Sequence, residues 1–236
     1  EGTPIHRAAM KETLAAGLLL EAGWDKLVLA ARGDGKGAVL VDPMTGSGTL
    51  AVEAALIACD MAPGLCKIAS WRGDGRMNPH RIPPCLRWKD FTTQKEWDVL
   101  IDKATQRAKS GMKWARSLAP DQSDHKNVQI IANEKNPGAA SLAQSSIRSA
   151  GVGGIVSLSE GDCLDWNLGG GEPNSNSSRE IIEGRTIFVC NPPWGLRLTE
   201  DIDESWVSLR EFFRREAGGC EAWILSGNAG LTKILR

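Results

Sequence analysis

Residues Asn191-Pro192-Pro193-Trp194 place an amide, two prolines and an aromatic ring directly after an apolar run, residues 186–190. The apolar run predicts a buried strand, and proline cannot continue a sheet because it fixes φ and lacks a backbone donor. We therefore expect a rigid turn at the carboxyl end of a strand. Its carbonyl oxygens can accept the hydrogens of a planar amine while the ring stacks on the face, and an amino group of a nucleobase is the obvious candidate. The alternative is that Asn191 caps a turn and Trp194 is ordinary core.

A second chemical feature is the segment 42–49, Asp-Pro-Met-Thr-Gly-Ser-Gly-Thr, which lies between a short apolar run and an alanine-rich helical stretch. Glycines at 46 and 48 let the backbone approach a ligand closely, and the start of the following helix offers unpaired N–H groups to an anionic group. The pattern Gly46-x-Gly48-x-x-Ala51 also fits the dinucleotide fingerprint loosely. That fingerprint needs an acidic residue about 20 positions further on. The next predicted strand ends at Glu134, 86 positions after Gly48, and no Walker lysine follows the glycines.

Two acidic residues follow the next predicted strands. Glu134 comes after residues 128–132 and is placed to accept hydrogen bonds from ribose hydroxyls, or is an exposed carboxylate at a helix start. Asp162 comes after residues 155–158 and could accept from an adenine amino group, or forms an Asx turn. Because the carboxyl ends of parallel strands share one edge of a sheet, we expect these residues to lie on the same rim as Asn191.

These residues need a sheet to position them, and the rest of the pattern predicts one. Apolar runs alternate with helical periodicity throughout the chain, which indicates a Rossmann-like, doubly wound α/β fold with a mostly parallel sheet and helices on both faces. The predicted strands are 38–41, 128–132, 155–158, 186–190 and 222–225, and the predicted helices are 8–22, 49–59, 97–115, 137–151 and 206–217.

The 236 residues, 42% of them hydrophobic, suit one large domain, residues 1–236. Within it we expect an N-terminal helix in 1–24, an irregular insertion at 60–93 and a flexible loop at 167–184. The formal net charge of −1 does not indicate a nucleic-acid binder as a whole. The exception lies between Lys67 and Lys89, where six cations face one acid, and this stretch either contacts phosphate or is a solvated loop.

The six cysteines form no CxxC pair, which indicates reduced, buried thiols inside a cell, without distinguishing the compartment. A zinc site built from Cys59, Cys66, Cys85 and His80 fits no standard knuckle, so we predict no metal. No apolar run reaches about 18 residues and no signal peptide is visible, so we predict no membrane contact.

With these residues in place, the chain resembles class I, S-adenosyl-L-methionine-dependent methyltransferases. More narrowly, it is similar to the RNA guanine-N2 methyltransferases that usually carry a THUMP RNA-binding domain. The residues that carry the resemblance are Lys11-Glu12-Thr13-Leu14-Ala15-Ala16, Ala22-Gly23-Trp24, Asp42-Pro43-Met44-Thr45-Gly46-Ser47-Gly48-Thr49, Asn191-Pro192-Pro193-Trp194-Gly195, Arg197 and Leu225-Ser226-Gly227-Asn228.

The resemblance implies S-adenosyl-L-methionine as cofactor and assigns its parts to the rim. Glu134 would hold the ribose, Asp162 with Cys163 the adenine, and Thr13 the carboxylate, while Asn191 would border both cofactor and acceptor. The residues assigned to the methionine part are Asp42, Pro43, Thr45, Gly46, Ser47, Gly48 and Thr49.

The resemblance also implies the reaction, which is methyl transfer to the N2 amine of guanine in ribosomal or transfer RNA, without a metal. Asn191 Oδ1 and the Pro192 carbonyl would accept the amine hydrogens, Pro193 would keep the turn rigid, and Trp194 would stack on an unpaired or flipped base. Three departures from the family stand out: Trp194 replaces tyrosine, Glu134 replaces aspartate, and neither the closing strand pair nor the RNA-binding domain is within this sequence. The RNA partner would then need a domain that is missing from this chain.

Three other functions remain open. The amide-Pro-Pro-aromatic group also serves adenine-N6 methylation, so the motif fixes a planar amine and not the base. A nicotinamide-dependent oxidoreductase and a catalytically idle RNA-binding scaffold are the alternatives from other classes.

Overall fold

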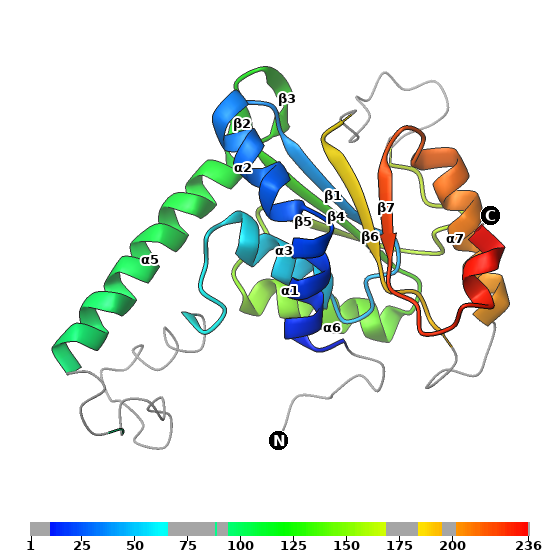
Figure 1. Ribbon diagram of the computed structural model, residues 1–236, viewed down its shortest axis with the longest axis horizontal. Coiled ribbons are helices and arrows are strands. Elements are labelled where there is room, and N and C mark those ends of the chain that lie inside the picture. Colours follow the sequence, from blue (N-terminus) through cyan, green and yellow to red (C-terminus); the bar gives the residue numbers. More distant parts are fainter. Residues whose placement is uncertain (1–9, 66–87, 89–93, 169–183, 195–201, 236) are drawn as a thin grey trace.

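The computed structural model describes residues 10–65, 88, 94–168, 184–194 and 202–235. Strand β1 (Ala38–Asp42) is buried at every position and forms the middle of a five-stranded parallel sheet with the order β5-β4-β1-β6-β7 (Figure 1). The other strands are β4 (Val128–Glu134), β5 (Val156–Glu160), β6 (Thr186–Cys190) and β7 (Glu221–Ile224). A parallel sheet covered on both faces requires continuous apolar strands, which explains the unbroken runs in β1 and β6.

Alternate residues of β1 face two separate cores, so helices cover both faces of the sheet. Leu40 packs with the helices that follow and precede β1, whereas Val39 and Val41 pack with Phe212 of α7 on the opposite face. The first face is covered by α1 (Glu12–Glu21), α2 (Trp24–Asp34), α3 (Thr49–Ala58) and α6 (Pro137–Ser149), and the second by α7 (Ile202–Glu216). Right-handed crossovers produce this split, because the chain moves outward in one direction from β1 to β5 and in the other from β6 to β7. The predicted fold class is confirmed.

Helix capping follows the sequence closely at α6. Asn136 Oδ1 accepts the Ala139 N–H at 3.0 Å, and Pro137 occupies the first helical turn. The helix predicted at 97–115 is longer than expected, since α5 runs over Gln94–Arg116. Gly23, predicted as a helix stop, has φ +76° and separates α1 from a second helix, α2, that the pattern analysis missed.

The hairpin β2 (Leu118–Ala119) and β3 (Gln122–Lys126), and the short 3-10 helix η3 (Leu231–Leu235), were also missed. Strand β3 reads Gln-Ser-Asp-His-Lys, so it carries no apolar alternation that could have revealed it. The insertion predicted at 60–93 and the loop predicted at 167–184 lie largely outside the described residues, and so does the N-terminal part of the helix predicted at 8–22. Within the part of the chain that the structure describes, every helix is too short or too polar to cross a membrane.

Candidate active site

The carboxyl ends of the three central strands meet at one edge of the sheet. Asp42 is the last residue of β1 and pairs in register with Ala132 of β4, while Val41 pairs with Phe188 of β6. Because the chain continues from β1 to β4 on one side and places β6 on the other, the strand order reverses between β1 and β6. Ligands of open α/β sheets bind in the crevice at such a reversal. The glycine-containing loop after β1 and the Asn191 turn after β6 are the two segments that border it.

The loop after β1 is shaped by its two glycines. Gly46 and Gly48 have φ +59° and +80°, a region that favours glycine. A β-carbon on Gly48 would lie 3.1 Å from Ala143 of α6, so a side chain there would also crowd the neighbouring helix. A β-carbon on Gly46 would meet nothing within 4 Å, so the backbone at this position borders open space. Further along the loop, the hydroxyls of Ser47 and Thr49 lie 3.3 Å apart.

Glu134 braces this loop through both of its carboxylate oxygens. Oε2 accepts the Gly46 N–H at 2.7 Å, and Oε1 accepts the Asn136 N–H at 2.8 Å. The side chain is therefore neither a free acceptor nor only an exposed carboxylate at a helix start. Each carboxylate oxygen has a second acceptor site, so ribose binding by Glu134 stays a prediction that these contacts leave room for.

Asn133, which sequence reasoning missed, joins three of the strand-end segments. Its side-chain Nδ2 donates to Pro43 O at 3.3 Å and to Gly161 O at 2.9 Å. Its backbone carbonyl accepts the Thr45 N–H at 2.9 Å. The side chain is only 1% exposed. A polar residue directly after the apolar run 128–132 was the signal that could have revealed it.

Three buried side-chain oxygens at this edge have no hydrogen-bond partner among the described residues. They are Asp42 Oδ2, Thr45 Oγ1 and Asn133 Oδ1. Buried polar atoms are normally paired, so unpaired acceptors gathered at the ends of two adjacent strands indicate a ligand that donates hydrogen bonds or carries positive charge. The ammonium group of a methionine moiety is such a ligand, and these residues therefore fit the expected cofactor.

The carboxyl group of Asp42 is held in an unusual state by its surroundings. Its pKa is raised from 3.8 to about 7, first by burial and to a smaller extent by the charge of Glu134. The Met44 N–H and the nearby Thr45 hydroxyl, which lies outside hydrogen-bonding geometry, act in the opposite direction. A cation bound beside Asp42 would favour the ionised form. The site is thus better suited to a positively charged group than to an anion.

Asp162 is engaged locally in the structure. Oδ1 accepts the Leu164 N–H at 2.9 Å, which is an Asx turn, and Oδ2 pairs with Lys135 Nζ at 2.8 Å. Burial alone would raise the pKa of Asp162, but the Leu164 N–H, Lys135 and the Ser208 hydroxyl together lower it. Its predicted contact with adenine stays a prediction.

Two further predicted residues are far from ideal as ligands through their side chains. Cys163 is 2% exposed and packs in the core beside Phe188, and burial raises the pKa of its thiol to about 12. A cofactor contact from this residue would therefore use its backbone. Thr13 lies exposed in the first turn of α1, and its predicted contact with the cofactor carboxylate stays a prediction.

The Asn191 turn is held by two indole groups. Trp194 Nε1 donates to Asn191 Oδ1 at 3.0 Å, and Trp206 Nε1, from α7, donates to Pro193 O at 2.7 Å. A β-carbon on Gly227 would lie 2.2 Å from the Trp194 ring, so the ring packs directly on that glycine. Asn191 is half-buried, and the oxygen predicted to receive the substrate amine already holds a hydrogen bond within the motif.

The turn lies close to the loop after β1. Cys190, the last residue of β6, is fully buried, and its pKa is raised by burial and then by the charges of Asp42 and Cys163. Asp42 and Cys190, the residue before Asn191, therefore interact electrostatically. Gly195 and Arg197, which the resemblance also used, lie outside the described residues. Within the part of the chain that the structure describes, no group of three or more His, Cys, Asp or Glu side chains could hold a metal ion.

A parallel sheet of this order, with a glycine loop after its first strand, an acid after the second and an amide-Pro-Pro-aromatic turn after the fourth, defines a Rossmann-like class I methyltransferase. Residues 3–222 match the family described as "RMKL-like, methyltransferase domain". The chain belongs to this family, which confirms the predicted resemblance to methyltransferases.

Curated relatives agree with this assignment. "Ribosomal RNA large subunit methyltransferase K/L" of Syntrophotalea carbinolica is 31% identical over 243 residues, which cover 98% of this chain and 28% of the relative. The protein of the same name from Hahella chejuensis is 29% identical over 228 residues, covering 96% and 26%. The chain thus spans about a quarter of the length of the curated relatives it matches.

Two solved structures share the fold at lower identity. A possible methylase from Clostridium difficile 630 superposes with a TM-score of 0.65 at 22% identity, covering 98% of this chain and 48% of that one. SMU.472, solved as a complex with SAH, has a TM-score of 0.63 at 19% identity and the same coverage.

Proposed function

We propose that this chain transfers the methyl group of S-adenosyl-L-methionine to the exocyclic N2 amine of guanine in RNA, with large-subunit ribosomal RNA as the substrate. The observation that carries the proposal is that the Asn191 turn follows β6 at the same edge of the sheet where β1 and β4 present the three unpaired oxygens of Asp42, Thr45 and Asn133. A pocket for a cationic methyl donor and a slot for a planar amine then share one rim. The names of the curated relatives support ribosomal RNA as the substrate.

The residues of the turn would orient the amine. When bound, the cofactor supplies an electrophilic methyl group. Asn191 Oδ1 and the Pro192 carbonyl accept the two amine hydrogens, which directs the nitrogen lone pair away from them and toward the cofactor side of the crevice. No strong base is needed before attack, so orientation supplies most of the acceleration.

The base would displace a contact that the free protein makes. Trp194 donates to Asn191 Oδ1 in the structure, so the substrate amine takes the place of the indole N–H on that oxygen. Exchange of one donor for another keeps the oxygen satisfied and costs little. The indole ring is then released to stack on the base, which contributes about 1–3 kcal/mol in single-strand binders.

Methylation of a defined RNA tests the proposal. The chain is incubated with labelled S-adenosyl-L-methionine and an unmodified transcript of large-subunit ribosomal RNA, and the nucleosides are identified by mass spectrometry. We expect N2-methylguanosine with the wild-type chain, formed at least about tenfold more slowly with Asn191→Ala. If N6-methyladenosine forms instead, the guanine-N2 proposal is wrong and the adenine-N6 alternative takes its place. No methylated nucleoside, with NADH binding and no S-adenosyl-L-methionine binding in a calorimetric titration, would favour the oxidoreductase.

A further inference from the structure

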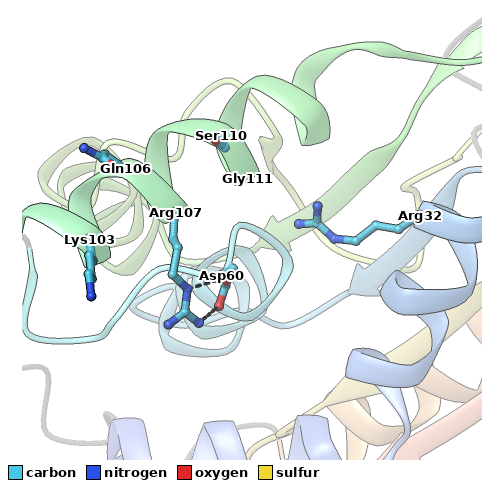
Figure 2. A pocket seen from close by; sticks show the side chains of 7 residues that line it. All are labelled: Arg32, Asp60, Lys103, Gln106, Arg107, Ser110 and Gly111. Atoms are coloured by element: carbon cyan, nitrogen blue, oxygen red, sulfur yellow. Dashed lines mark hydrogen bonds and ion pairs between the residues drawn. The ribbon is translucent and has the colours of Figure 1, made fainter. Parts of the chain in front are cut away.

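A basic hollow of about 440 Å³ lies between α2, the end of α3 and α5, away from the rim described above. It is lined by Arg32, Asp60, Lys103, Gln106, Arg107, Ser110 and Gly111, and Figure 2 shows these side chains. Lys103 and Arg107 project from α5 toward the same side, and Arg32 reaches toward them from α2 (Figure 2). Helix α3 joins the glycine loop at its start to the hollow at its end, so the two sites are about 15 Å apart along its axis.

The close approach of α5 to α3 creates this hollow. A β-carbon on Gly111 would lie 1.9 Å from the carbonyl oxygen of Cys59, so only glycine lets the two helices cross here. Asp60, the next residue, has φ +52°, which turns the chain away from the end of α3. The lining residues are thus fixed by backbone packing.

The hollow carries net positive charge. Arg107 pairs with both carboxylate oxygens of Asp60, with Nε to Oδ2 at 2.7 Å, and these contacts lower the pKa of Asp60 so that it stays ionised. This pair is neutral as a unit. Arg32 and Lys103 add positive charge to this neutral pair, and the charge of Arg32 also contributes to the lowered pKa of Asp60.

Arg32 is held in place before any ligand binds. Its Nη2 donates to Ala58 O at 2.9 Å, and its guanidinium carbon lies 3.9 Å from the centre of the Trp114 ring. A guanidinium has five N–H donors, so most of them stay available. Little side-chain entropy is then lost when an anion binds to this cation.

Charge along α5 is distributed unevenly and favours an extended anion. The acids of this helix, Glu96, Asp98 and Asp102, all precede Lys103. From Lys103 onward every charged side chain of the helix is a cation. These exposed side chains are Lys103, Arg107, Lys109, Lys113 and Arg116. A chain with a net charge of −1 therefore concentrates positive charge beside the hollow.

We infer that the basic hollow binds the phosphate backbone of the substrate RNA, on a stretch separate from the methylated nucleotide. The inference rests on the proposed function for the identity of the polyanion. Gln106 and Ser110 also line the hollow and add neutral donors, which suits phosphate oxygens. Binding here is independent of base sequence and positions the RNA on the catalytic domain.

Removal of one cation tests the inference. The binding of the unmodified large-subunit ribosomal RNA transcript is measured between about 50 and 200 mM salt. Lys103→Gln should weaken binding about fivefold at about 0.1 M salt and lower the slope of log K against log salt by about 0.7. The matched control is Lys95→Gln, which removes the same charge from an exposed position of the same helix, before its acids and outside the hollow, and it should change affinity by less than about twofold.

A second variant adds a cation where none is present. Gln106→Lys should tighten binding and steepen the salt slope by about 0.7, and this gain cannot arise from misfolding. Equal losses for Lys103→Gln and Lys95→Gln, or no change for Lys103→Gln and Gln106→Lys, would overturn the inference.

The two proposals fail separately. S-adenosyl-L-methionine affinity, measured by calorimetry, should be the same in all variants because the hollow lies at the far end of α3. If RNA binding follows the hollow variants but no methylguanosine forms, the proposed function fails and the hollow still binds RNA. If methylguanosine forms and all variants bind alike, only the inference on the hollow fails.

Discussion

The Asn191 side chain shows how one polar atom can serve two partners in turn. Its Oδ1 accepts the Trp194 indole N–H at 3.0 Å, and the proposed reaction requires the same oxygen to accept the substrate amine. In the protein alone the hydrogen bond keeps a half-buried acceptor satisfied. The reaction therefore depends on the amide oxygen, and the indole N–H only occupies that oxygen until the substrate amine binds.

Asn191→Ala should lower kcat for methyl transfer at least tenfold, or about 1.4 kcal/mol, because one acceptor of the amine is lost. S-adenosyl-L-methionine affinity should stay nearly unchanged, since the unpaired oxygens of Asp42, Thr45 and Asn133 are intact. Single-turnover kinetics and calorimetry measure the two quantities. Wild-type kcat in this variant would contradict the site and favour the idle-scaffold alternative.

Trp194 should act through its ring and not through its N–H. Trp194→Phe keeps a stacking surface and should raise KM for RNA by less than about threefold, whereas Trp194→Ala should raise it at least about fivefold through lost stacking. Steady-state kinetics on the RNA transcript compare the two. Equal effects of Phe and Ala would show that the indole N–H matters more than the ring.

At the scale of elements, α7 positions the turn after β6. Trp206 is fully buried, and its Nε1 donates to Pro193 O at 2.7 Å, so a helix on one face of the sheet fixes a loop at its edge. A hydrogen bond of the same kind occurs on the other face of the sheet, where Nε1 of the fully buried Trp24 donates to Ala54 O at 2.9 Å. The second contact is remote from the turn, which makes it a matched comparison.

Trp206→Phe should lower both stability and kcat, since it leaves Pro193 O without its donor and loosens the turn. The free energy of unfolding should fall by about 1–3 kcal/mol. Trp24→Phe should lose similar stability but keep kcat when both are assayed well below their unfolding temperatures. Chemical denaturation and single-turnover rates measure these effects, and an equal loss of kcat in both variants would mean that Trp206 acts only through stability.

At the scale of the whole molecule, the buried carboxyl group of Asp42 at the cofactor-binding edge of the sheet lowers the stability of the fold when it is ionised. Burial raises the pKa of Asp42 from 3.8 to about 7, so ionised Asp42 is unfavourable in the folded protein. A raised pKa stabilises the fold below the unfolded value and loses that effect as pH rises through the folded value. Stability should therefore fall between about pH 4 and pH 7 through this one group.

Asp42→Asn isolates this group because it cannot titrate. Its free energy of unfolding, compared with that of the wild type, should rise with pH by up to about 4 kcal/mol between pH 4 and 7 and then stay level. Its S-adenosyl-L-methionine affinity should fall, because the charge opposite the ammonium group is gone. Urea denaturation across pH and calorimetry test both, and a pH-independent difference in stability would contradict the assigned pKa.

Much of this arrangement could be predicted from local sequence. Short, mostly apolar runs identified the five strands of the sheet, and Asn136-Pro137 identified a helix start, because an apolar run and a helix cap are each formed by residues that are neighbours in sequence. Helix α2 and the β2–β3 hairpin were missed, since a glycine that ends one helix can begin another and a polar strand has no apolar period. The types of residue on the rim were also local information.

The sequence by itself determined which chemical groups follow which strands, since each group is a few residues from an apolar run. Only the tertiary structure decided how these groups meet. Glu134 bonds Gly46 across 88 positions, Asn133 reaches Pro43 across 90, and Trp206 holds Pro193 from another element. Such contacts depend on strand order and helix packing, which bring distant residues within hydrogen-bond distance and which no local pattern encodes.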